Sequence, residues 1–165
     1  MLPRMHLHVV EASTSGNTEY VTHVLADYVG STKHEARSTK PVMVTMVRAE
    51  EATAEDLLKG DVLLLACGTW NTGGREGQLN PHMHELLLKR AKAIDLARKP
   101  CAVIALGDAR YRYTANAAVH LEDFVKRHGG RLLLPSLQIV NEPYGQEGKI
   151  RVWGEKLVKK LTKSS

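Results

Sequence analysis

The segment Ala12-Ser13-Thr14-Ser15-Gly16-Asn17-Thr18 separates a short apolar run, Leu7 to Val10, from a run with helical periodicity. Four of its residues supply a hydroxyl group: Ser13, Thr14, Ser15 and Thr18. Gly16 permits a tight turn, so consecutive backbone N–H groups can converge on one point at the start of the next helix. Such a loop can bind a phosphate dianion without a lysine. A Ser/Thr-rich turn that merely caps a helix is the alternative, and the segment alone leaves both open.

Two common nucleotide-binding loops do not match this segment. A nucleoside triphosphate loop requires Gly-Lys-Ser/Thr after its glycines, and a dinucleotide fingerprint requires three spaced glycines. The segment has one glycine and no lysine. The phosphate group that it predicts therefore belongs to another kind of ligand.

Apolar runs alternate with amphipathic ones along the whole chain. We expect strands at 7–10, 42–47, 61–67 and 101–106, and a fifth from 131 to 140 that Pro135 interrupts. We expect helices after the 12–18 segment up to Gly30, from Thr53 to near Gly60, from Asn80 to Ile94, from Ala117 to Gly129, and from about Gln146 onward. The runs 61–67 and 101–106 show no polar alternation, which is typical of strands covered on both faces.

This alternation predicts an α/β fold: an open, doubly wound parallel sheet of five strands with helices on both faces, in one domain over residues 1–165. Ligands bind such sheets at the carboxyl ends of the strands. The loops that leave the first, third and fourth strands meet there. They are the 12–18 segment, the polar loop 68–79 and the loop 107–113.

Two aromatic residues, Trp70 and Tyr111, occupy the second and third of these loops, and the chain has only eight aromatics. Either one alone could equally serve packing. Together with a phosphate loop, they match what flavin mononucleotide (FMN) requires: a planar ring between aromatic side chains and a phosphate at a helix N-terminus.

The three loops closely resemble those of the flavodoxins, of the short-chain type. Residues 13–20 are similar to the family's phosphate loop, 61–65 with Thr69-Trp70 to its third strand and first ring-flanking loop, and Gly107-Asp108 with Tyr111 to the second. The resemblance implies the strand order 2-1-3-4-5 and FMN as cofactor. It assigns FMN contacts to Ser13, Thr14, Ser15, Gly16, Asn17, Thr18, Gly68, Thr69, Trp70, Asn71, Thr72, Gly107, Asp108 and Tyr111. Trp70 and Tyr111 would flank the ring, and Asp108 would lie near its pyrimidine edge.

The chain departs from the family pattern in its charge. The net charge is +5, whereas most flavodoxins are strongly acidic, and Arg110 and Arg112 decorate the second ring-flanking loop. Gly68 stands where the family often has a hydroxyl residue. We therefore expect redox partners with acidic docking surfaces and a weaker repulsion of the reduced flavin.

The resemblance implies a low-potential electron-transfer flavoprotein that carries single electrons between a reductase and acceptor proteins, without catalytic residues of its own. Alternatives are an NAD(P)H-dependent flavin or quinone reductase and an activator of a ribonucleotide reductase. A phosphoacceptor signalling domain would need aspartates at the strand ends, where Glu11 and Cys67 stand.

The composition limits the cellular compartment and the binding partners that we expect for the protein. No apolar run is long enough to span a membrane, and the basic residues are spread over every segment, so we expect neither membrane nor nucleic-acid partners. Cys67 and Cys101 should lie roughly 17–20 Å apart and unbonded, which favours a cytoplasmic protein. His6 and His8 lack a visible third ligand, so we expect an exposed strand start and no metal. We expect a monomer.

Overall fold

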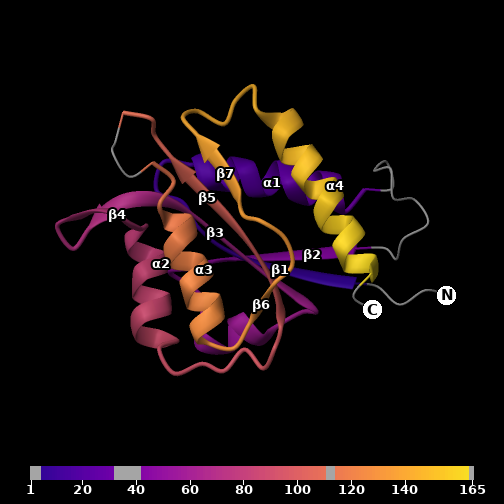
Figure 1. Cartoon of the computed structure of the whole chain (residues 1–165), viewed down its shortest axis with the longest axis horizontal. Coiled ribbons are helices and arrows are strands. Elements are labelled where there is room, and N and C mark those ends of the chain that lie inside the picture. Colours follow the sequence, from indigo (N-terminus) through magenta and orange to yellow (C-terminus); the bar gives the residue numbers. More distant parts are fainter. Residues whose placement is uncertain (1–4, 32–41, 111–113, 164–165) are drawn as a thin grey trace.

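The computed structural model describes residues 5–31, 42–110 and 114–163 and places them around one sheet (Figure 1). The strands are β1 (Met5–Ala12), β2 (Val42–Arg48), β3 (Val62–Thr72), β4 (Arg75–Leu79), β5 (Pro100–Gly107), β6 (Arg131–Leu132) and β7 (Leu137–Val140). The parallel order is β2-β1-β3-β5-β6, with β7 also beside β5. Because β6 and β7 together fill the fifth position, the predicted 2-1-3-4-5 order and fold class are confirmed.

Register brings the carboxyl ends of the central strands together. Ala12 at the end of β1 pairs with Cys67 on β3, and Cys67 pairs with Ala105 on β5. The loops that follow these strands therefore begin side by side at one edge of the sheet. This is the edge where the sequence predicts a ligand.

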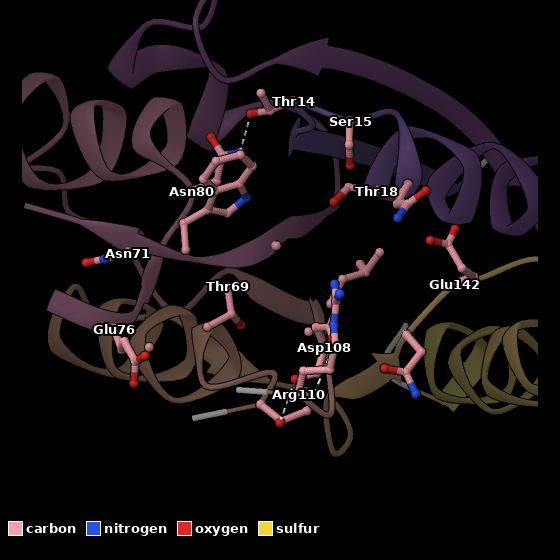
Figure 2. Close-up of a pocket in the computed structure, with 18 residues that line it drawn as sticks. Thr14, Ser15, Thr18, Thr69, Asn71, Glu76, Asn80, Asp108, Arg110 and Glu142 are labelled. Carbon is pink, nitrogen blue, oxygen red and sulfur yellow. Dashed lines mark hydrogen bonds and ion pairs between the residues drawn. The ribbon is translucent and has the colours of Figure 1, made fainter. Parts of the chain in front are cut away.

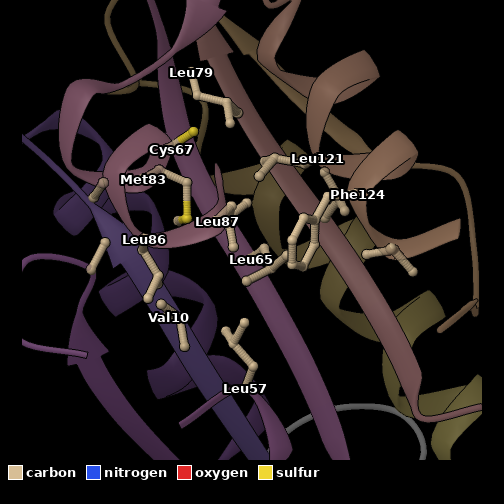
Figure 3. Packing of buried hydrophobic residues seen from close by; sticks show 14 of the residues in the cluster. Val10, Leu57, Leu65, Cys67, Leu79, Met83, Leu86, Leu87, Leu121 and Phe124 are labelled. Carbon is tan, nitrogen blue, oxygen red and sulfur yellow. The ribbon is translucent and has the colours of Figure 1, made fainter. Parts of the chain in front are cut away.

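Helices cover both faces of the sheet (Figure 1). They are α1 (Asn17–Val29), α2 (Pro81–Glu85) continued by the π-helical segment η2 (Leu86–Arg90), α3 (Ala117–Arg127) and α4 (Glu147–Lys163), with a short 3-10 segment η1 (Ala54–Leu58). Leu25 of α1 and Trp153 of α4 pack on one face, and Leu87 and Phe124 pack on the other (Figure 3). Fully burying one such leucine contributes about 1.5–3 kcal/mol.

The loop predicted over residues 68–79 is wrong, because this segment is a hairpin. β3 runs on to Thr72 and pairs antiparallel with β4. The intervening Gly73 and Gly74 have φ of 68° and 78°, the positive values that a two-residue hairpin turn requires. Three of the four residues before them, Thr69, Trp70 and Thr72, are β-branched or aromatic and favour strand over loop.

Two smaller predictions also need correction, and a third is confirmed. The third helix stops at Arg90 instead of continuing to Ile94, since η2 widens the helix and Ala91 leaves the helical region. The last strand is divided into β6 and β7 around Pro135, as its proline indicated. His8 is buried rather than exposed, and the Thr45 hydroxyl lies 2.6 Å from both His6 Nε2 and His8 Nδ1.

Candidate functional site

The phosphate-binding loop is shaped by Ser13 and Gly16. The Ser13 hydroxyl accepts hydrogen bonds from the backbone N–H groups of Gly16 (3.1 Å) and Glu19 (3.3 Å). Gly16 has φ of 91°, which a side chain would strain. These two residues hold the loop in shape, whereas Thr14, Ser15, Asn17 and Thr18 line a cavity of about 700 Å³ beside it.

Several hydrogen-bond donors of the residues that line the cavity here have no protein acceptor among the described residues. Within the described residues, no acceptor faces the N–H groups of Asn17 and Thr18, the first two of α1. The hydroxyls of Ser15 and Thr18 also have no partner in this part of the chain. Unpaired donors at a helix N-terminus fit a phosphate dianion.

Thr14 is oriented by Asn80, which the sequence indicated only as the start of the third helix. Asn80, fully buried, donates from Nδ2 to Thr14 Oγ1 (2.9 Å), while its Oδ1 accepts from the N–H of His82 and caps α2 (Figure 2). Since Thr14 Oγ1 accepts this bond, its own proton remains available for a ligand. Asn80 thus ties the phosphate loop to the start of α2.

The end of β3 forms one wall of the cavity through Gly68, Thr69, Trp70 and Asn71. Trp70 is 40% exposed, and its Nε1 would lie 3.3 Å from a Cβ added at Gly68. Glycine at 68 therefore leaves room for the indole. Thr69 Oγ1 accepts from the N–H of Ala117 at the start of α3.

Thr72 does not line the cavity. Its hydroxyl donates to the carbonyl of Leu79 (2.5 Å) and closes the hairpin of β3 and β4.

The loop after β5 forms the opposite wall. Gly107 permits it, because a Cβ there would lie 2.1 Å from the N–H nitrogen of Ala115. Asp108 and Arg110 both line the cavity and pair with each other, with Arg110 Nε 3.0 Å from each carboxylate oxygen (Figure 2). Arg110 holds the pKa of the Asp108 carboxyl below its ordinary value through these hydrogen bonds. Tyr111, predicted to flank the ring, lies outside the described residues, as does Arg112.

Eight cavity residues were not predicted as binding residues: Glu76, Gly77, Asn80, Leu106, Arg110, Thr114, Asn141 and Glu142. Glu76 and Gly77 reach the cavity through the hairpin that the sequence analysis treated as a loop. Asn141, with φ of 67°, accepts from the N–H of Ala109 and holds the 107–110 loop. An Asn-Gly-like turn signal is missing after β7, so no sequence pattern indicated this contact.

The charges on the cavity wall are mixed. Glu76, Asp108 and Glu142 face it together with Arg110, whereas Arg75 is exposed outside the lining residues. The described part of the rim is therefore not the basic surface that the net charge of +5 suggested. The ion pair of Arg110 with Asp108 is the clearest effect of a basic residue on the charge of the cavity wall.

An open α/β sheet, a phosphate loop at a helix N-terminus and an exposed indole across the same cavity define a protein that binds a phosphorylated aromatic ligand. Comparison with known proteins identifies the group within that class. The chain matches the family model for flavodoxin over residues 9–153, and it belongs to the flavodoxin family.

Several relatives match nearly the whole chain. A flavodoxin from Maridesulfovibrio salexigens is 30% identical over 154 residues, 93% of this chain and 97% of the relative. A probable flavodoxin 2 from Bacillus subtilis is 32% identical over 140 residues, 84% of each chain. Among solved structures, oxidised flavodoxin 2 from Bacillus cereus has a TM-score of 0.76 at 27% identity and covers 94% of this chain and 99% of its own.

FMN is the cofactor that the family indicates, and the cavity fits it. About 700 Å³ lies within the range of small-molecule sites. The unpaired donors suit the phosphate, and the indole of Trp70 suits a flat ring. Elsewhere among the described residues, no cluster of potential metal ligands occurs and no helix is long and apolar enough to cross a membrane. Cys67 and Cys101 are buried and unbonded, as predicted.

Proposed function

We propose that this flavodoxin carries single electrons at low potential, from a reductase to acceptor proteins, with FMN held non-covalently in the cavity described above. The membership of the family establishes a flavin-based electron-transfer role. The observation that supports FMN as the bound electron carrier is the set of unpaired donors at the start of α1, on the same cavity as the exposed Trp70. Bound FMN supplies the redox chemistry.

The protein's own residues then bind FMN and position it. Ser15, Thr18 and the first amides of α1 hold the phosphate, and Thr14 donates to it while Asn80 fixes its hydroxyl. Trp70 covers a ring face and limits access of water and of a second substrate. These are binding and positioning roles, in agreement with a carrier that performs no bond-making chemistry.

The charged residues should set the reduction potential of FMN and the choice of redox partner. Arg110 offsets the Asp108 carboxylate beside the cavity, so the reduced flavin should meet less repulsion than it does in an acidic relative. The net charge of +5 of the whole chain, in contrast to the mixed charges on the cavity wall, supports partners with acidic docking surfaces, approached as a monomer. The two buried thiols support a reducing, cytoplasmic setting.

Steady-state oxidation of NADPH separates this proposal from a reductase on the same scaffold. The FMN-loaded protein alone should consume no NADPH above free FMN, and it should pass electrons to cytochrome c once an NADPH-dependent flavodoxin reductase is added. Rapid NADPH oxidation by the protein alone would contradict the carrier and favour the reductase.

A further inference from the structure

A buried carboxyl group stands near the end of β1, two residues before Ser13 of the phosphate-binding loop. Glu11, the residue before Ala12, is only 3% exposed near the end of β1, and its Oε2 has no partner among the described residues. Its strand neighbours are Arg48 on β2 and Ala66 on β3. An ionised carboxylate in such a place is costly unless a cation is bonded to it.

The nearby cation is engaged elsewhere. Arg48 Nη2 lies 3.5 Å from Glu19 Oε2 on α1, and His23 lies 3.8 Å from the other Glu19 oxygen. Glu50 follows β2 and adds a further negative charge, whereas β3 contributes only uncharged Ala66. Burial is the main cause that raises the pKa of Glu11 to about 7; repulsion from Glu19 and Glu50 adds to it, and attraction from Arg48 opposes it.

Glu11 is coupled to the phosphate-binding loop both by its nearness along the chain and by electrostatic interaction. Ser13, two residues on, accepts from the N–H of Glu19, which lies in the first turn of α1. The same turn presents the unpaired amides of Asn17 and Thr18 to the cavity. A charge on Glu11 therefore acts on a phosphate dianion at this helix end through protein interior, where screening by salt is weak.

We propose that Glu11 is a proton-binding site that sets FMN occupancy: the neutral acid favours binding of the phosphate, and the carboxylate weakens it. This inference rests on the proposed FMN site. By linkage, bound FMN must in turn favour the protonated form of Glu11. The protein would then retain its cofactor more tightly as the pH falls through neutrality.

The test is the FMN dissociation constant between pH 6 and 8.5 at constant ionic strength, measured by quenching of flavin fluorescence. Relative to Glu11→Gln, wild type should lose about five- to twentyfold in FMN affinity over this interval. The ionisation of the FMN phosphate itself cancels in this comparison, since both proteins bind the same ligand. Glu50→Gln, an exposed acid of the same cluster, is the matched control and should keep most of the wild-type slope.

Carbon-13 NMR of the glutamate side chains in flavin-free protein supplies a second readout. The Glu11 signal should titrate near pH 7 and disappear in Glu11→Gln. A Glu11 titration near 4.5, or equal FMN pH profiles in wild type and Glu11→Gln, would overturn the inference. If neither protein bound FMN at any pH, the proposed cofactor site would fail and this coupling with it, while the NMR titration would still report the protonation of Glu11.

Discussion

Replacement of Glu11 by glutamine should make the protein more stable at alkaline pH. The pKa of Glu11 rises from 4.5 to about 7 on folding, mainly because burial disfavours the carboxylate. A group with a raised folded pKa contributes stability that is complete below 4.5 and is lost as the pH rises through about 7. At about 1.36 kcal/mol per pH unit, this interval of about 2.5 corresponds to at most about 3 kcal/mol.

Urea unfolding of flavin-free protein at pH 4.5, 6, 7 and 8.5 measures this effect. Between pH 4.5 and pH 8.5, the free energy of unfolding of wild type should fall by up to about 3 kcal/mol more than that of Glu11→Gln. Glu50→Gln should follow wild type closely, because that side chain is exposed. Parallel pH profiles for wild type and Glu11→Gln would show that the native protein holds Glu11 as a well-solvated carboxylate and would refute the reasoning.

Three further outcomes are expected. Thr14→Ala should weaken FMN about ten- to a hundredfold, since one charge-assisted hydrogen bond is lost, and should leave riboflavin affinity unchanged; an equal loss for riboflavin in a fluorescence titration would place Thr14 away from the phosphate. Arg110→Gln should lower the potential of the second electron step by about 15–90 mV for a charge at roughly 8–12 Å and effective dielectrics of about 20–80, with Lys89→Gln as a remote control; spectroelectrochemistry showing no change would remove Arg110 from the flavin's environment. Burial lowers the pKa of His8 below 6.5. The neutral His8 side chain therefore contributes stability that is present above pH 6.5 and is lost as the pH falls through the lower pKa of the folded protein. An NMR titration of His8 above 6.5, or an equal loss of stability at acid pH in His8→Gln and wild type, would contradict this.

The main features of the fold could be predicted because local signals agree with global ones. Uninterrupted apolar runs such as 61–67 indicate strands buried on both faces, and the stripes between them indicate the covering helices. The segment 12–18 could be assigned for the same reason: its hydroxyls and Gly16 suit a helix N-terminus whether or not a ligand binds.

What sequence reasoning missed depends on distant contacts. Asn80 reads as a helix cap, and only the folded chain shows its amide bonded to Thr14, 66 positions earlier. The hairpin of β3 and β4 was hidden because polar residues and glycines are common to loops and tight turns alike. Arg110 was expected near the flavin, but its pairing with Asp108 depends on side-chain geometry that no spacing rule supplies.

A potentiometric titration of the FMN-loaded protein, followed by its visible spectrum, tests the central claim most directly. A carrier of single electrons should take up its two electrons in two separate one-electron steps, with FMN bound in a 1:1 ratio throughout. A single two-electron step, or release of the flavin during the titration, would contradict the assignment of this chain as a one-electron FMN carrier.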